Sequence, residues 1–175
     1  MFGCAVAVKS AVTLRHLFLS SGHNFFGRHG EPAGRFPALD AAVIRCHAGR
    51  GIVGDRFYDY RPGYNGQITF FAWETVVAAR GHFRRPHLEA AVFRRNVITE
   101  GVQLNELIGE RFLLGGVEFE GVAEAKPCHW MDTVVAPGAE VWLRRQGGLR
   151  AKILSDGELH RGPAEWCAPG LLALG

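Results

Sequence analysis

Long apolar runs are missing from this sequence. No segment of the 175 residues approaches the ~20 apolar residues of a membrane-spanning helix. The apolar residues 2–8 have no positive charge before them and end at Lys9, a pattern too short and wrongly flanked for a signal peptide. The sequence therefore predicts a soluble, cytoplasmic protein without a membrane partner.

Long runs of positive charge are missing as well. The 20 Lys and Arg residues exceed the 17 Asp and Glu residues slightly, which gives a formal net charge of +3. The arginines are scattered or paired, whereas nucleic-acid-binding chains usually gather them in clusters. This pattern predicts no nucleic-acid partner and is compatible with a small anionic ligand.

Cysteine is scarce, and no Cys-x-x-Cys pair occurs. A disulfide framework or a structural zinc site normally shows closer spacing. Free thiols are therefore expected. The four cysteines are Cys4, Cys46, Cys128 and Cys167.

What the sequence does contain is typical of one globular domain that spans residues 1–175. Hydrophobic residues make up 47% and charged residues 21%. Short β-branched and aromatic segments predict strands, and Gly115-Gly116 and Asp156-Gly157 are typical hairpin turns. The expected strands are 12–20, 41–46, 67–71, 97–99, 117–124, 150–155 and 158–161, and the expected short helices are 72–80, 86–93 and 104–108. Trp73, Val76 and Val77 would form the buried face of the first helix. The fold class is mainly β with a few short helices, a twisted barrel or a curled sheet.

Residues 49–54 match Gly-x-Gly-x-x-Gly and follow an expected strand. A dinucleotide site also needs a helix to begin directly after the turn. The following residues 55–63 are aromatic and interrupted by proline, so we reject that site. The glycines instead indicate a tight turn that presents Asp55 and Arg56.

Residues 21–40 form an expected loop of about twenty residues, a length typical of binding loops. It contains several polar side chains able to transfer protons or donate hydrogen bonds. We expect His23, Asn24 and His29 to line the mouth of a site and to act on its substrate.

The segment Lys126-Pro127-Cys128-His129 places a cysteine behind a proline and between cationic groups. Proline fixes the direction of the chain, and neighbouring cations favour the thiolate, the form that binds soft metals. A cysteine can also be a small buried hydrophobe. The pattern favours a functional thiol at Cys128.

The surroundings of Cys128 resemble the MOSC domain family, over a core of about residues 41–163. The resemblance rests on an Arg-Asn pair at residues 95–96, a Leu-rich turn that ends at Gly109, the Pro127-Cys128 pair and the segment Gly148-Leu149-Arg150-Ala151. A Gly-Ile-x-Gly-Asp-Arg element at residues 51–56 belongs to the same pattern. One departure is that Gly162 is followed by Pro163, where the family commonly has Gly-Asp.

This resemblance implies a MOSC-type β-barrel that binds the molybdenum cofactor, with Cys128 as the metal ligand. Arginine suits the cofactor phosphate, and asparagine suits the edge of its heterocycle. Adjacent strand residues point to opposite faces, so only one of Arg94 and Arg95 is expected to face the ligand. The candidate cofactor-binding residues are Arg94, Arg95, Asn96, Asp55, Arg56, Lys126, His129 and Arg150, although surface charges and local ion pairs could explain several of them.

The resemblance further implies a reductase of small N-hydroxylated compounds with Cys128 as a catalytic residue, and the polar loop adds His23 and His29 as the other candidate catalytic residues. The sequence has no cysteine set for an iron-sulfur cluster, so a separate ferredoxin-like or flavin reductase protein would supply electrons. Two alternatives stay open. The protein could carry sulfur as a Cys128 persulfide, or carry the cofactor without turnover, or it could be a degenerate barrel that serves as an interaction module.

Overall fold

A closed β-barrel dominates the computed structural model, which describes residues 10–28 and 30–167. Its strands are hydrogen-bonded in the order β11-β7-β8-β9-β5-β6-β1, and β1 pairs with β11 to close the barrel. The pair β5–β6 is parallel and the other pairs in this circuit are antiparallel. The strands are β1 Ser10–Leu19, β5 Ile68–Ala72, β6 Val97–Glu100, β7 Arg111–Leu114, β8 Val117–Glu124, β9 Leu149–Ile153 and β11 Gly162–Cys167. The predicted fold class, mainly β with a few short helices, is confirmed.

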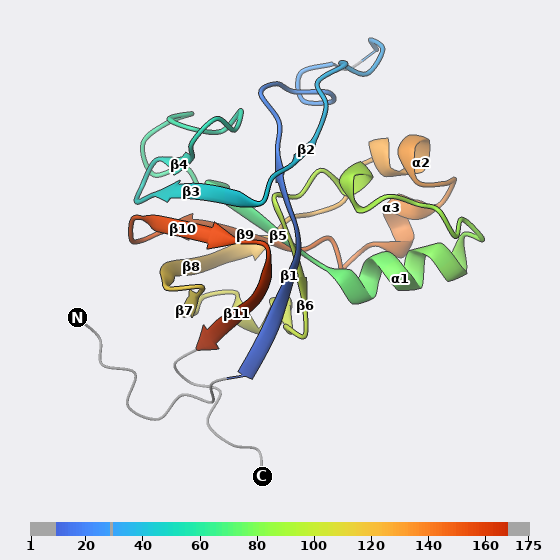
Figure 1. Ribbon diagram of the computed structural model, residues 1–175. Helices are drawn as coiled ribbons and strands as arrows, with labels where there is room; N and C mark the ends of the chain where they lie inside the picture. Colours follow the sequence, from blue (N-terminus) through green and yellow to red (C-terminus); the bar gives the residue numbers. More distant parts are fainter. Residues whose placement is uncertain (1–9, 29, 168–175) are drawn as a thin grey trace.

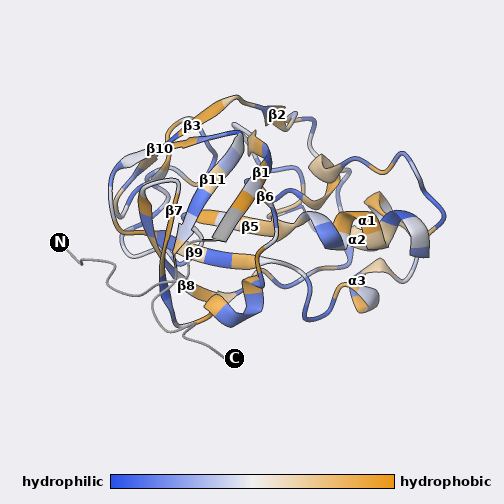
Figure 2. Cartoon of the chain, turned by 60° about the horizontal axis from the view of Figure 1, so that its bottom comes forward, coloured by the Kyte–Doolittle hydropathy of each residue, from blue (hydrophilic) through white to orange (hydrophobic). Residues whose placement is uncertain are grey.

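The barrel interior is filled by aliphatic side chains and by aromatic rings in contact. The ring of Phe70 lies 5.8 Å from that of Phe112 and 5.4 Å from that of Phe119, and all three side chains are buried. In β8 the burial alternates from Val117 onward, as a strand with one wet face requires. Figure 2 shows the hydrophobic character of β5, which lies between β9 and β6 in the wall of the barrel.

Four helices gather on one side of the barrel (Figure 1). They are α1 Trp73–His82, η1 Ala90–Phe93, α2 Trp130–Val134 and α3 Ala139–Trp142. A second apolar core joins the barrel residues Phe71 and Ile98 to Val76 of α1 and Met131 of α2, and it fixes these helices against the outside of the barrel. The short helix η2 Leu104–Leu107 instead adds two leucines to the barrel core.

Two details of the expected helices were wrong. Val77 is 50% exposed, because α1 buries Thr75, Val76 and Ala79 instead. The helix expected at 86–93 shortens to η1, because the chain turns at Leu88, whose N–H donates to the carbonyl of Arg85.

A three-stranded sheet lies beside the barrel and contains β3 Val43–His47, β4 Gly51–Ile52 and β10 Gly157–His160. The short strand β2 Leu39–Asp40 pairs with the end of β1. Asp156-Gly157 was predicted to connect a hairpin, and this is wrong because β10 pairs with β3 and not with β9. Oδ1 of Asp156 accepts a hydrogen bond from the N–H of Ala48 at 2.7 Å, which holds the connection between β9 and β10 against the turn after β3.

Residues 53–67 after the glycine-rich turn consist of turns and bends, so the helix of a dinucleotide site is absent there. No described helix has the length and apolar character to cross a membrane.

Candidate functional site

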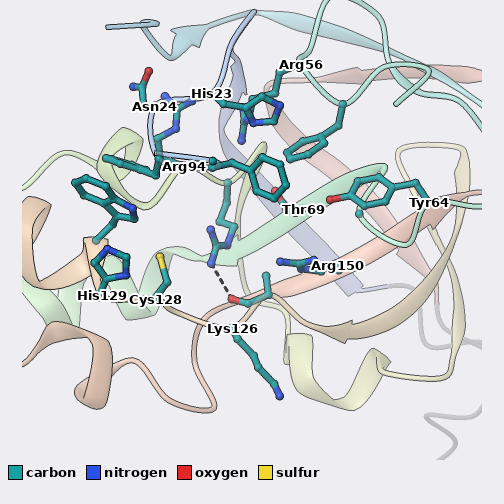
Figure 3. Close-up of a pocket in the computed structure, with 18 residues that line it drawn as sticks. His23, Asn24, Arg56, Tyr64, Thr69, Arg94, Lys126, Cys128, His129 and Arg150 are labelled. Atoms are coloured by element: carbon teal, nitrogen blue, oxygen red, sulfur yellow. Dashed lines mark hydrogen bonds between the residues drawn. The ribbon is translucent and has the colours of Figure 1, made fainter. Parts of the chain in front are cut away.

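A cavity of about 520 Å³ opens beside the barrel, where four parts of the chain meet. They are the loop after β1, the turns between β4 and β5, the residues before β6, and the segment that joins β8 to α2, with Arg150 of β9 completing the wall. Figure 3 shows Cys128 and His129 at one end of this pocket and Tyr64 at the other. Its lining residues are His23, Asn24, Phe25, Phe26, Gly27, Arg56, Phe57, Tyr64, Gly66, Thr69, Arg94, Arg95, Ala125, Lys126, Cys128, His129, Trp130 and Arg150.

Cys128 is a free, exposed thiol in this pocket. Its carbonyl accepts a hydrogen bond from the N–H of Met131 at 2.8 Å, so the residue is held at the start of α2. Cys46 contrasts with it, because Cys46 is fully buried and burial raises the pKa of its thiol to about 12. Of these two free thiols, Cys128 alone is accessible to solvent and ligand.

The expectation of four free thiols was wrong at Cys167, which is disulfide-bonded. Sequence spacing could not reveal this bond, because it depends on which distant segments the fold brings together. Cys4 lies outside the described residues.

Positive charge dominates the pocket, and none of its lining residues is Asp or Glu. A concave surface with one sign of charge concentrates counter-ions. The pocket is therefore suited to an anionic ligand. Its cationic lining residues are Arg56, Arg94, Arg95, Lys126 and Arg150.

Both Arg94 and Arg95 line the pocket, so the expectation that one would face away was wrong. The alternation of a strand does not apply here, because β6 begins only at Val97. Arg94 ends η1 with a left-handed backbone, at a φ of 56°.

Arg95 connects three segments of the wall through backbone carbonyls. Its Nη1 donates to Phe93 at 2.9 Å, its Nη2 to Ala125 at 2.7 Å and its Nε to Gly147 at 2.9 Å. Burial, together with Arg150, lowers the pKa of Arg95 to about 10. The guanidinium therefore stays protonated at neutral pH and fixes the chain that leads to Cys128.

Arg94 performs a similar task for the long loop. Its Nη2 donates to Oγ of Ser20 at 3.2 Å and to the carbonyl of Gly22 at 3.0 Å, and its Nη1 donates to the carbonyl of Phe36 at 3.2 Å. Burial, and then the charge of Arg56, lowers its pKa to about 10. Arg94 thus holds the loop over the pocket.

Arg150 and Arg56 have more donors available for a ligand. The exposed side chain of Arg150 makes no hydrogen bond or ion pair with any described residue. Arg56 makes one polar side-chain contact, from Nη1 to Oδ2 of Asp55 at 3.4 Å.

Asp55 and Asn96 are not among the lining residues and lie buried behind the wall. Oδ2 of Asp55 accepts hydrogen bonds from the N–H of Ser20 and from Nδ2 of Asn96, both at 3.2 Å. Oδ1 of Asn96 accepts hydrogen bonds from the N–H and the hydroxyl of Thr69. The two residues connect the lining residues Arg56 and Thr69 to β1.

The loop brings His23 and Asn24 to the pocket, as the sequence predicted, whereas His29 lies outside the described residues. Asn24 exchanges two hydrogen bonds with the backbone of Phe36, so it stabilises the loop. Burial, and then the charges of Arg56 and Arg94, lowers the pKa of His23. His23 is therefore mostly neutral at neutral pH and able to exchange a proton.

The cations on either side of Cys128 also line the pocket. His129 lies beside Cys128 in Figure 3, and its ring is 5.1 Å from that of Trp130. Lys126 is exposed, and its side chain points away from Cys128 in the same view.

Sequence reasoning missed the aromatic walls of the pocket. The ring of Phe25 stacks on Trp130 at 4.8 Å near the thiol, and Phe57 stacks on Tyr64 at 5.2 Å. The available signal is the aromatic density of residues 25–26 and 57–64, of which the second segment alone served as evidence, against a helix. Aromatic faces can stack on planar ligands and exclude water.

Within residues 10–28 and 30–167, no group of three or more His, Cys, Asp and Glu side chains could hold a metal ion. Cys128 is thus a single soft donor in a pocket of cations. A metal held there would need most of its ligands from a cofactor.

The fold and the site define a β-barrel protein with an accessible thiol in a pocket lined by cations. The MOSC domain model matches residues 45–163, so the chain belongs to the MOSC domain family, as the sequence motifs indicated. The barrel is the MOSC-type barrel that the resemblance implied.

Solved structures agree on the fold. The YUAD protein from Bacillus subtilis has a TM-score of 0.72 at 14% identity, over 93% of this chain and 98% of that chain. YiiM from Geobacillus stearothermophilus has a TM-score of 0.66 at 15% identity, over 94% of this chain and 79% of that one. YiiM from Escherichia coli has a TM-score of 0.61 at 15% identity, over 93% of this chain and 71% of that one. Among curated proteins, none matches this chain.

Proposed function

We propose that this protein binds the molybdenum cofactor through Cys128 and reduces small N-hydroxylated compounds. The observation that carries the proposal is the placement of an exposed thiol in a pocket with several cations and no carboxylate. MOSC domains are associated with molybdenum cofactor systems. Family membership therefore supports the same ligand.

The residues present fit the cofactor. Its phosphate needs cationic forks, and Arg150 and Arg56 have donors that no described residue occupies. A thiolate is a soft anionic donor suited to molybdenum, and Cys128 supplies it at the opposite end of the pocket from Tyr64. The cavity of about 520 Å³ is within the range of small-molecule and cofactor sites.

The bound cofactor would supply the two-electron redox change that this reduction needs. Overall, the N–O bond of the substrate breaks, two electrons and two protons are consumed, and water leaves with an amine-type product. The electrons come from a separate ferredoxin-like or flavin reductase protein. Cysteines for an iron-sulfur cluster are missing from the sequence.

The residues of the chain position and protonate the substrate. His23 is mostly neutral and faces the pocket, so it can exchange a proton with the substrate oxygen. The stacked rings of Phe25 and Trp130 offer the substrate an aromatic wall near the thiol. Arg95 holds Ala125, three residues before Cys128, and thereby fixes the thiol.

The test is expression in a host that makes the cofactor, followed by measurement of bound molybdenum and of hydroxylamine reduction with reduced viologen. Wild type should contain molybdenum and turn over, and Cys128→Ser should lose both while staying folded. Cys46→Ala is the matched control and should keep both. Wild-type turnover in Cys128→Ser would refute the cysteine-ligand mechanism.

A second candidate is a sulfur or cofactor carrier, which the exposure of Cys128 favours because a carried group must reach another protein. A carrier would show sulfane sulfur on Cys128, or bound cofactor, without substrate reduction. Purified protein with neither molybdenum nor sulfane sulfur would exclude both candidates and support the interaction module.

A further inference from the structure

The segment that leads to Cys128 lies beside Gly147. The N–H of Gly147 donates to Oε1 of Glu124 at 3.3 Å, and a Cβ added at Gly147 would lie 2.4 Å from the carbonyl oxygen of Ala125. Arg95 bridges the same two segments through the carbonyls of Ala125 and Gly147. Gly147 therefore packs against the chain that leads to the thiol, and Arg144 and Arg145 precede it by three and two residues.

These segments carry cations without ionic partners. Arg144, Arg145 and Lys126 are exposed, and none of them forms a side-chain hydrogen bond or an ion pair with a described residue. Glu124 lies on the same segment as Lys126, and its carboxylate, which accepts a hydrogen bond from the N–H of Gly147, offsets only one of these three charges. An excess of positive charge therefore remains at this edge of the pocket.

Many arginines elsewhere on the surface are paired. Arg15 lies 2.7 Å from Glu100, Arg45 lies 3.2 Å from Glu158, and Arg161 lies 3.2 Å from Asp40. Such pairs cancel much of the local field, whereas unpaired cations attract an acidic surface. The contrast sets the edge beside Cys128 apart from the surface around those pairs.

We propose that Arg144 and Arg145, with Lys126 beside them, form the docking surface for an acidic electron-transfer protein. This inference rests on the proposed reductase function. Lys126 precedes Cys128 by two residues, which span at most ~7 Å of extended chain, so a partner docked there lies near the thiol. The side chain of Lys126 points away from the thiol in Figure 3, as expected for contact with a partner outside the pocket. Complementary charge of this kind speeds association and fixes the orientation of the partner.

The experiment compares the double variant Arg144→Glu/Arg145→Glu with wild type, using an acidic [2Fe–2S] ferredoxin and its NADPH-dependent reductase as the probe. At low ionic strength, hydroxylamine reduction driven by ferredoxin should fall roughly tenfold or more. Reduction driven by reduced viologen should stay at the wild-type rate, because the small donor needs no docking surface. Added salt should slow the ferredoxin reaction of wild type much more than that of the variant.

The control is Arg45→Glu, which reverses one charge in β3, away from the helices in Figure 1, and so makes half the change of net charge of the double variant. It should keep the ferredoxin-driven rate. Equal loss in Arg45→Glu would show a general effect of net charge and overturn the proposal.

Direct titration of ferredoxin onto the cofactor-loaded protein separates docking from catalysis. Weaker binding in the double variant supports the docking surface even if wild type fails to turn over with viologen, an outcome that would reject only the reductase function. Equal binding to wild type and variant overturns the docking surface. A different outcome is that wild type binds a single-stranded oligonucleotide and not ferredoxin, and that the double variant loses this binding. This outcome would assign the surface to nucleic acid and overturn the proposed ferredoxin docking.

Discussion

Nδ2 of Asn96 donates a hydrogen bond to Oδ2 of Asp55 at 3.2 Å, which joins two buried polar side chains behind the pocket wall. Asn96 also donates to the carbonyl of Phe18 and accepts two hydrogen bonds from Thr69. Both the NH2 group and the carbonyl oxygen of its amide are therefore hydrogen-bonded. This role differs from the predicted contact with the cofactor, which stays a prediction.

The first prediction follows from this arrangement. Asn96→Ala removes one partner from the buried carboxylate of Asp55 and one from the half-buried Thr69, so the free energy of unfolding should fall by about 2–3 kcal/mol. Chemical denaturation measures the change. Asn105→Ala is the control, because Asn105 is exposed and donates one hydrogen bond, to the carbonyl of Arg145. A decrease below about 0.5 kcal/mol in Asn96→Ala would contradict the structural role of this amide.

The second prediction concerns thiol reactivity. Iodoacetamide should modify Cys128 in the folded protein and should leave Cys46 unmodified, because Cys46 is fully buried and its pKa is raised to about 12. Mass spectrometry of peptides identifies the labelled residue. Denaturation should expose Cys46 to the reagent. Rapid labelling of Cys46 in the folded protein would show that β3 opens readily.

The third prediction is a pH dependence that arises from His23. Its pKa is lowered in the folded state, mainly by burial, so the unfolded chain binds more protons as the pH falls through ~6.5. The free energy of unfolding therefore carries no penalty from His23 above that pH, and it falls on acidification as the unfolded chain takes up the proton. His23→Gln should reduce this fall, as measured by denaturation at about pH 7.5 and about pH 5.5. An unchanged pH dependence would show that His23 is as solvated as in the unfolded chain.

The barrel and much of the pocket could be predicted because their signals are patterns among residues close together in the sequence. Alternation in β8 and the glycines at 115–116 are local signals, and the motifs around Arg95 and Cys128 placed the thiol and its cations in one site. The wrong expectations depended on distant contacts. The partner of β10 is β3, more than a hundred residues earlier in the chain.

Local rules also failed at Arg94, because the left-handed end of η1 cannot be read from propensity. The aromatic walls need residues of the first loop to meet α2, as Phe25 meets Trp130. Such contacts between segments are fixed only when the whole barrel is formed.

The last prediction separates an arginine that holds the wall from an arginine that is free for a ligand. Arg95 donates to three backbone carbonyls, and a lysine cannot reach all three with the fork geometry of a guanidinium. Arg95→Lys should therefore lower the free energy of unfolding by about 2 kcal/mol or more. Arg150→Gln should leave stability within about 0.5 kcal/mol of wild type, because Arg150 is exposed and makes no hydrogen bond or ion pair with a described residue.

Cofactor retention should show the opposite order. Arg150→Gln should lose more bound pterin than Arg95→Lys, when both are compared per folded molecule. Bound pterin per folded molecule should fall strongly in Arg150→Gln, because the phosphate loses a bidentate cationic partner. Denaturation curves and pterin fluorescence after cofactor release measure the two quantities on the same samples. Full pterin content in Arg150→Gln would mean that the phosphate is held elsewhere, with Arg56 as the next candidate and then the Arg94 and Arg95 pair that the sequence suggested.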